Sequence, residues 1–388
     1  MTNEILALNS IAKTADVVFG NKYKLVKESK EPVAVVLRSF KMHDYTLPSS
    51  VLCVGRAGAG VNNIPLDRYA SEGVVVFNTP GANANAVKEL VILSMLLSAR
   101  KVFDGICWSQ TLLGSGSEVE KLVEGGKSNF SGGEILGKTL AVVGLGAIGI
   151  LVANTAVDLG MMVIGYDPYI NVESARKLNP KVVIKHDLAG ILSCADYISL
   201  HTPLNDGTRG MICEKSIMGM KKGVSIINAS RSELVDNEAL KAGLKNGHIN
   251  RYVTDFPTAS ILGVDNVVPI PHLGASTAEA EDNCGHMVAN QIVDFIENGN
   301  ITNSVNFPAC RLDRTGKQRL TIIHKNVKGV LSAITDLVGG SGINISGFVS
   351  QSGGGTFAYA ILDLDSELST DMLKKVEKLE NVVKVRVI

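Results

Sequence analysis

A glycine-spaced turn at residues 141–149 constrains the fold of this chain more than any other feature. Its sequence, Ala-Val-Val-Gly-Leu-Gly-Ala-Ile-Gly, starts as an apolar strand and opens directly into a helix. Gly144 permits a tight turn, Gly146 lets a phosphate approach the backbone, and Gly149 lets the helix pack against its strand. Unpaired N–H groups and the helix dipole favour an anion at this point. The turn therefore predicts a nucleotide-binding strand, turn and helix.

A carboxylate follows the next predicted strand, as recognition of a dinucleotide requires. The helix ends at Gly160, the strand 161–166 follows, and Asp167 comes after it, roughly 20 residues beyond the glycines. A carboxylate in this place accepts hydrogen bonds from a ribose diol and repels a 2′-phosphate. The pattern therefore predicts NAD, rather than NADP, as the cofactor.

Composition limits the partners and the compartment. A chain of 388 residues has room for about two or three domains. Basic and acidic residues number 38 each, so neither nucleic acid nor an anionic membrane is an expected partner. The six cysteines show no metal-ligand spacing, and they predict a reducing compartment without a metal site. Neither a signal peptide nor an apolar span of about 20 residues is present, and we expect a cytoplasmic protein.

Strand and helix signals alternate along most of the chain. Before the glycine turn they predict a separate α/β unit, and after it they complete a doubly wound parallel sheet. Between the two, Gly105 to Ser131 is interpreted as a solvated surface connection. A final helix, 279–298, is placed to return to the first unit. The predicted strands are 33–37, 51–54 and 74–77 in the first unit, and 197–201, 225–228, 251–255 and 267–270 after Asp167.

The C-terminal residues predict a small third unit beyond a linker. Residues 306–316 lack periodicity, whereas the segment that follows has the order βαββαβ, typical of a ferredoxin-like domain. Its last strand places Val383, Val385 and Val387 on one face, as a one-sided antiparallel sheet requires. This unit carries no evident catalytic set. Two interpretations stay open, an oligomerisation module and a ligand sensor.

Polar residues that could carry chemistry follow the ends of several predicted strands, where open α/β sheets bind ligands. Arg38, Arg56 and Arg231 together predict a pocket for an anion, because the guanidinium fork suits carboxylate and phosphate. His272 follows a strand and a proline and precedes a glycine turn. An imidazole that titrates near neutrality is a natural acid and base for hydride transfer to a carbonyl.

The motifs together resemble those of the D-isomer-specific 2-hydroxyacid dehydrogenases that carry a C-terminal ACT domain. The resemblance implies an NAD-binding Rossmann domain at 85–274 and a discontinuous flavodoxin-like substrate-binding domain at 1–84 and 275–305. It further implies a linker at 306–317 and an ACT regulatory domain at 318–388. The segments that carry the resemblance are Gly55–Asn63, Asn78–Gly81, Gly144–Gly149, His201–Leu204, Asn228–Arg231 and Pro271–Thr277.

The resemblance also implies a role for individual residues. Arg231 would bind the substrate carboxylate and polarise the C2 oxygen, and His272 would exchange the proton of the C2 hydroxyl. Residues expected to bind the substrate are Arg38, Ser39, Arg56, Ala57 and Gly58. Residues expected to bind NAD are Gly144, Gly146, Ala147, Ile148, Gly149, Asp167, Thr202, Thr208 and Asp255. Residues expected to bind an effector, L-serine, at the interface of paired ACT domains are His324, Asn326 and Asn344.

The reaction implied is NAD-dependent oxidation of D-3-phosphoglycerate to 3-phosphohydroxypyruvate, the first step of L-serine biosynthesis, in a homodimer or homotetramer. Two alternatives stay open: a reductase for glyoxylate or hydroxypyruvate, and an NAD-binding regulatory protein with reduced catalysis. The regulatory alternative follows from a departure. Ala259 and Ser260 stand where the family normally has a glutamate that holds the catalytic histidine, and Ser232 replaces a usual glycine.

Overall fold

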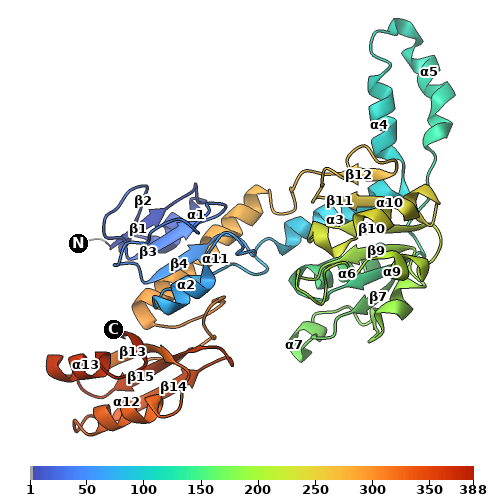
Figure 1. Cartoon of the computed structure of the whole chain (residues 1–388). Helices are drawn as coiled ribbons and strands as arrows, with labels where there is room; N and C mark the ends of the chain where they lie inside the picture. Colours follow the sequence, from blue (N-terminus) through green and yellow to red (C-terminus); the bar gives the residue numbers. More distant parts are fainter. Residues whose placement is uncertain (1–2) are drawn as a thin grey trace. The chain divides into compact units, whose positions relative to one another are not determined.

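The computed structural model describes residues 3–388, which divide into two compact units (Figure 1). The first unit contains Met1–Asn83 and Glu281–Ile388, and the second contains Ala84–Ala280. The finer division into substrate-binding, NAD-binding, linker and ACT segments stays a prediction. None of the helices within 3–388 is both long and apolar enough to span a membrane.

The second unit is built on a parallel sheet of seven strands in the order β12-β11-β10-β9-β6-β7-β8. Apolar side chains alternate between its two faces: Ala141 and Val143 enter one core, whereas Leu140 and Val142 enter another. The doubly wound parallel sheet is therefore confirmed. Its strands are β6 (Thr139–Val143), β7 (Met162–Tyr166), β8 (Val183–Ile184), β9 (Tyr197–Leu200), β10 (Val224–Asn228), β11 (Ile249–Thr254) and β12 (Val267–Pro269). Its helices include α3 (Ala84–Ala99), α6 (Ala147–Asp158), α7 (Val172–Ala175), α8 (Leu188–Leu192), α9 (Glu214–Met218), α10 (Asn237–Lys245) and the short η3 (Ser232–Leu234).

A helical hairpin projects from the second unit, where the sequence predicted a solvated connection (Figure 1). These helices bury no residue, as the prediction of a solvated surface segment requires, but the segment is helical: residues 102–130 form α4 (Val102–Gln110) and α5 (Val119–Gly126), with the short helices η1 (Gly116–Glu118) and η2 (Lys127–Phe130). Glycine and serine suggested a loop, but apolar residues recur at helical spacing. Trp108 and Phe130 hold the hairpin together with ring centroids 5.1 Å apart.

The first unit contains a parallel sheet of five strands in the order β2-β1-β3-β4-β5, which is the flavodoxin-like order. Its strands are β1 (Asn3–Ala7), β2 (Tyr23–Val26), β3 (Ala34–Leu37), β4 (Cys53–Arg56) and β5 (Val75–Phe77). Helices α1 (Thr14–Phe19), α2 (Leu66–Ser71) and α11 (Ala278–Asn298) accompany it. Gly55 lets α11 approach closely, because a Cβ there would lie 2.5 Å from the side chain of Val288.

The C-terminal segment forms a separate antiparallel sheet in the order β14-β15-β13-β16, and the βαββαβ prediction is confirmed. Its elements are β13 (Gln318–Lys325), α12 (Val330–Gly339), β14 (Ile345–Gln351), β15 (Phe357–Leu364), α13 (Thr370–Glu377) and β16 (Val382–Val387). Leu320 and Ile322 face the core beneath the two helices, whereas Ile323 joins the core that contains Phe295 of α11. Phe307 and Cys310, in the predicted linker, are buried in that same core.

Arginines of this sheet bind the C-terminal end of α11. Arg386 donates to the carbonyl oxygens of Phe295 and Ile296, at 3.2 and 2.9 Å. Arg319 donates to the carbonyl of Asn298 at 2.8 Å. Because carbonyls at a helix C-terminus lack partners within the helix, these contacts stabilise α11 and attach the C-terminal sheet to it.

Candidate active site

The glycine turn has the geometry that a dinucleotide needs. Gly144 has φ of 96°, and a Cβ there would lie 2.7 Å from the carbonyl carbon of His201. A Cβ on Gly149 would collide with the carbonyl oxygen of Gly144. A Cβ built on Gly146 would meet no atom within 4 Å beyond the neighbouring residues of the chain, so the space beside this residue is open to a ligand. Ala147 and Ile148 begin α6, where N–H groups lack acceptors within the helix.

Asp167 stands at the end of β7 beside this turn. Its carboxylate oxygens accept hydrogen bonds from the N–H of Leu145 at 2.9 Å and from that of Tyr169 at 2.8 Å. Each oxygen keeps a further lone pair, and the side chain is half-buried, so it can also accept from a ribose hydroxyl. These residues fit the adenosine end of NAD.

The segment after β9 supplies the two predicted threonines. The Thr202 hydroxyl contacts the Met211 sulfur at 3.5 Å. The Thr208 hydroxyl donates to the carbonyl of Pro203 at 2.6 Å, so it closes a turn. His201 lies at the start of this segment, where burial lowers its pKa to about 4 and keeps the ring neutral near pH 7.

Phe256 brings the two predicted catalytic side chains of the second unit together. The Arg231 guanidinium lies 5.4 Å from the centre of the Phe256 ring. The His272 ring packs on the same phenylalanine, with centroids 4.3 Å apart. Asn228 fixes the Arg231 loop, because its amide donates to the Arg231 carbonyl at 2.8 Å and its oxygen accepts from the Ser230 N–H at 3.1 Å. A cation and an imidazole are thus both held against one aromatic ring.

Asp255 is the carboxylate whose charge acts on these two groups. Its side chain is 2% exposed, and one oxygen accepts from the Gly274 N–H at 3.2 Å. The other oxygen has no hydrogen-bond partner within residues 3–388. Burial raises the pKa of the Asp255 carboxyl, although the positive charges of His272 and Arg231 and the Gly274 N–H oppose that effect.

The departure noted after Asp255 is also visible in the structure. Ser260 is exposed, and its hydroxyl contacts Thr258 at 2.9 Å and receives a hydrogen bond from the Asn237 amide at 2.8 Å. This turn is a network of neutral side chains. Ser232, the second departure, donates to Glu233 at 2.9 Å.

In the first unit, the predicted anion-binding residues lie on two adjacent turns. Arg56 ends β4, and its Nε donates to the carbonyl of Arg38, which follows β3, at 3.1 Å. The Arg56 guanidinium lies over Gly58, where φ is 151° and a Cβ would collide with it. Ala57 is buried, and Ser39 is exposed beside Arg38.

Glu281, near the start of α11, was not predicted to take part. Its carboxylate forms an ion pair with the Arg38 guanidinium at 2.6 Å. Both side chains are partly exposed, so this pair contributes little to stability and an anionic ligand can compete with it.

The three predicted effector residues do not come together within one chain. His324 lies near the end of β13, and its Nε2 is buried without a hydrogen-bond partner within 3–388. Asn326 follows it and donates to the carbonyl of Gly355 at 3.1 Å. Asn344 precedes β14, and its backbone carbonyl accepts a hydrogen bond from the Asp365 N–H. Ile345 at the start of β14 and Gln318 at the start of β13 both pair with Leu364, so these two strands start at the same end of the sheet. Asn344 therefore lies at the opposite end of the sheet from His324, which is near the end of β13.

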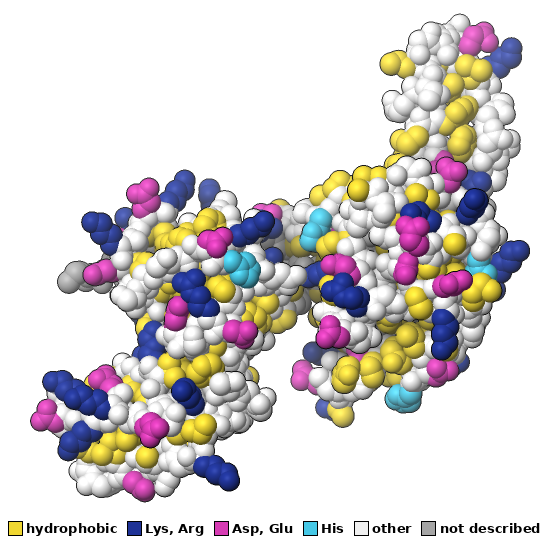
Figure 2. Space-filling model, in the orientation of Figure 1, with side chains coloured by type: hydrophobic (Ala, Val, Ile, Leu, Met, Phe, Trp, Pro, Cys, Tyr) yellow, Lys and Arg dark blue, Asp and Glu magenta, His cyan; other side chains and the backbone are white. Residues whose placement is uncertain are grey.

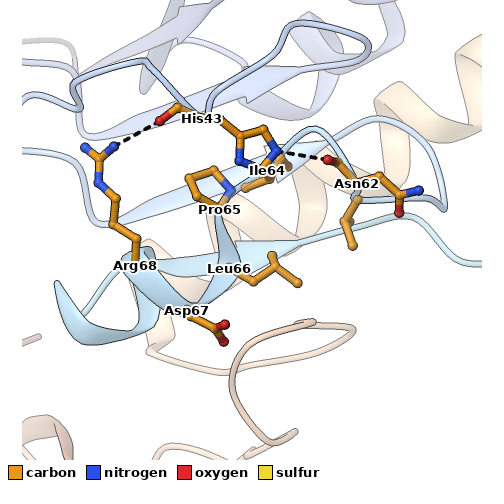
Figure 3. Close-up of a pocket in the computed structure, with 8 residues that line it drawn as sticks. His43, Asn62, Ile64, Pro65, Leu66, Asp67 and Arg68 are labelled. Carbon is orange, nitrogen blue, oxygen red and sulfur yellow. Dashed lines mark hydrogen bonds between the residues drawn. The ribbon is translucent and has the colours of Figure 1, made fainter. Parts of the chain in front are cut away.

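A cavity of about 390 Å³ in the first unit does not coincide with the predicted residues (Figure 3). Its walls come from the segments around His43 and Asn62, which are joined by a hydrogen bond of 3.0 Å. Arg68, on its rim, is paired with Glu72 at 3.0 Å. We assign no ligand to this cavity. Within 3–388, no cluster of histidine, cysteine, aspartate or glutamate could hold a metal ion.

Comparison with known proteins places the chain. Residues 111–274 match the family model of the D-isomer specific 2-hydroxyacid dehydrogenase, NAD binding domain. Residues 320–384 match that of the AHAS small subunit-like ACT domain. The D-3-phosphoglycerate dehydrogenase of Escherichia coli is 32% identical over 358 residues, covering 87% of this chain and 82% of the relative. That of Dictyostelium discoideum is 32% identical over 383 residues, covering 94% and 89%.

Solved structures agree with this placement. The NAD⁺-bound 3-phosphoglycerate dehydrogenase of Entamoeba histolytica superposes with a TM-score of 0.62 at 26% identity, covering 79% of this chain and 99% of that one. The chain carries an NAD-binding dehydrogenase domain followed by an ACT domain. It belongs to the D-isomer-specific 2-hydroxyacid dehydrogenase family.

Proposed function

We propose that this chain oxidises D-3-phosphoglycerate to 3-phosphohydroxypyruvate with NAD, the first step of L-serine biosynthesis. The observation that carries the proposal is the grouping of Arg231 and His272 on Phe256. A permanent cation and a titratable base are the pair that dehydrogenation of a 2-hydroxy acid requires. The names of the relatives support the choice of substrate.

The residues of the second unit act on the reacting carbon. Arg231 binds the carboxylate and polarises the C2 oxygen, and an interaction with developing charge contributes several kcal/mol to a transition state. His272 accepts the proton of the C2 hydroxyl as the C–O bond becomes a carbonyl. NAD, when bound, accepts the hydride from C2.

The phosphate is assigned to Arg38 and Arg56 of the first unit. Their turns are joined by the hydrogen bond from Arg56 Nε to the Arg38 carbonyl. Two guanidinium groups suit a dianion better than a small neutral group. This favours a phosphorylated substrate over glyoxylate or hydroxypyruvate.

One observation supports a second candidate, an NAD-binding regulatory protein with reduced catalysis. The turn at Thr258 and Ser260 carries hydroxyls where the resemblance implies a glutamate. Loss of a carboxylate that orients a catalytic histidine commonly lowers turnover by orders of magnitude.

The test is a rate measurement of NADH formation by the purified chain with D-3-phosphoglycerate, D-glycerate and D-lactate. We expect the highest kcat/KM with the phosphorylated acid. His272→Ala should lower kcat, whereas Arg231→Ala should raise KM and lower kcat. NAD binding without measurable turnover on any of these acids would favour the regulatory protein.

We further propose that L-serine binds the ACT domain and that the enzyme is a homodimer or homotetramer. β14 is an edge strand of its sheet. If two β14 strands pair about a twofold axis, the start of one lies beside the end of the other. Asn344 would then approach His324 and Asn326 of the second copy, the set that the resemblance implies. His324→Ala and Asn344→Ala should each abolish serine inhibition and leave the rate without serine nearly unchanged, which rate measurements at millimolar serine will check.

The cytoplasmic location stays a prediction.

A further inference from the structure

Two asparagine side chains, distant from each other in sequence, hold the turn Arg38–Phe40 of the first unit. This turn carries the proposed phosphate-binding arginine. Asn9 follows β1, and its Oδ1 accepts hydrogen bonds from the N–H groups of Arg38, Ser39 and Phe40 at 3.0, 3.1 and 2.9 Å. One amide oxygen thus satisfies three consecutive backbone donors. Backbone N–H groups that converge in this way attract negative charge, so the site demands an acceptor.

Asn63 holds the same turn with the opposite polarity. Its Nδ2 donates to the carbonyl of Phe40 at 2.7 Å and to that of Arg38 at 3.2 Å. The backbone carbonyl of Asn63 accepts from the Met42 N–H at 2.8 Å, which fixes Asn63 against the end of the turn. Asn63 lies between Asn62 and Ile64, whose side chains line the cavity wall in Figure 3. The site of Asn63 therefore demands a donor.

We propose that Asn9 and Asn63 are positioning residues that clamp the turn Arg38–Phe40 and set the place of the Arg38 guanidinium for the substrate phosphate. The inference rests on the proposed function. Neither asparagine is assigned a contact with substrate, because the Asn9 Oδ1 and the Asn63 Nδ2 form their hydrogen bonds with the backbone of the turn.

The clamp affects substrate binding because Glu281 competes with the substrate phosphate for Arg38. The Arg38 guanidinium pairs with Glu281 at 2.6 Å, so the substrate phosphate competes with that carboxylate for Arg38. A turn that shifts changes which anion Arg38 reaches, and a misplacement of about 1 Å is costly for an oriented site. Releasing the turn should therefore weaken substrate binding more than it slows the chemical step.

The experiment uses the opposite polarity of the two sites. Steady-state rates with D-3-phosphoglycerate and NAD are compared for the full chain, Asn9→Ala, Asn63→Ala, Asn9→Asp and Asn63→Asp. Aspartate accepts hydrogen bonds and cannot donate when ionised, so it preserves the first site and breaks the second. The two aspartate variants are matched controls, because each adds one negative charge beside the same turn.

We expect both alanine variants and Asn63→Asp to raise KM for D-3-phosphoglycerate about tenfold, roughly the net free energy of one hydrogen bond between the phosphate and a misplaced Arg38. The kcat and the KM for NAD should stay within about twofold, while Asn9→Asp keeps a KM near that of the unaltered chain. Hydrogen exchange of the amides of residues 38–40 should accelerate in Asn9→Ala and not in Asn9→Asp.

Equal KM increases in the two aspartate variants would overturn the proposal, because charge alone would then explain them. Unchanged KM in the alanine variants would overturn it as well. If an alanine variant fails to fold, the two aspartate variants decide the question between them. An inactive unaltered chain would refute the proposed function, and the exchange rates would then test the clamp by themselves.

Discussion

Breaking the ion pair of Arg319 and Asp363 in the C-terminal sheet should strongly lower the stability of the protein. Two parallel hydrogen bonds of 2.6 and 2.8 Å join the side chains, and both are fully buried. Removing one partner of such a pair leaves an uncompensated buried charge and costs about 3–5 kcal/mol. Arg319→Met should therefore lower the melting temperature of the unit by roughly 6–20 °C, at about 2–4 °C per kcal/mol.

The pH dependence of this loss follows from Asp363. Burial alone would raise the pKa of its carboxyl, but the hydrogen bonds from Arg319 and from Thr315 lower it below the ordinary value. A carboxyl whose pKa is lower in the folded state stabilises the protein above its unfolded pKa and ceases to do so as the pH falls through the folded pKa. The difference in melting temperature should therefore be largest near pH 7 and shrink in acid.

Calorimetry of the full chain measures the effect against a matched control. Arg311 forms a long, exposed pair with Asp313 at 3.8 Å, and Arg311→Met should change stability by less than about 1 kcal/mol. The double variant Arg319→Met/Asp363→Leu should recover part of the loss, since no charge is then left buried. Equal stability of Arg319→Met and Arg311→Met would refute the reasoning.

Three further predictions concern the cofactor, the buried carboxylate and the assembly. Asp167→Ala should raise KM for NAD about tenfold without improving use of NADP. Steady-state rates with both cofactors will show whether kcat/KM falls for NAD and stays unchanged for NADP. Because burial raises the pKa of Asp255, ionisation of this carboxyl costs free energy in the folded state. As the pH rises, the melting temperature of Asp255→Asn should therefore increase relative to that of the unaltered chain, while the variant loses activity. The opposite trend in melting temperature would contradict this. Ile106 on the projecting hairpin is 54% exposed and Leu113 is 93% exposed, within a helical pair that buries no residue. Light scattering should find that Ile106→Lys dissociates the oligomer at least about tenfold more readily than the control Val183→Lys, and equal assembly would exclude the hairpin from the interface.

Figure 2 shows hydrophobic side chains exposed along the projecting hairpin. Val102, Ile106 and Leu122 are all more than one-third exposed. Contiguous apolar surface on a protruding element is typical of a protein interface. We therefore predict that the hairpin forms a second contact between copies, in addition to the proposed pairing of β14 strands.

Local signals predicted most of the fold. The glycine turn, the apolar strands of the parallel sheet and the βαββαβ segment each depend on residues near one another in sequence. β1 was missed because Asn3–Ala7 is short and half-buried, and its pairing with β3 is set by contacts some 30 residues away. The hairpin was missed because Gly and Ser content was given more weight than helical spacing.

The site was predicted less completely, for a physical reason. Arg231 and His272 follow strands and could be selected from position, but their meeting on Phe256 depends on tertiary packing. Phe256 directly follows Asp255, and that adjacency was the one available signal. Asn9 and Glu281 carry no local signal, since each acts on the Arg38 turn from another element of the fold.

The central claim is that hydride leaves C2 of the phosphorylated acid while His272 takes the hydroxyl proton, and isotope transfer tests it most directly. D-3-phosphoglycerate deuterated at C2 is oxidised with NAD, and the reduced nicotinamide is analysed by mass spectrometry. The account predicts one deuterium in each molecule of NADH formed, with the rate strongly reduced in His272→Ala. Deuterium released to water, or an unchanged rate in His272→Ala, would contradict it.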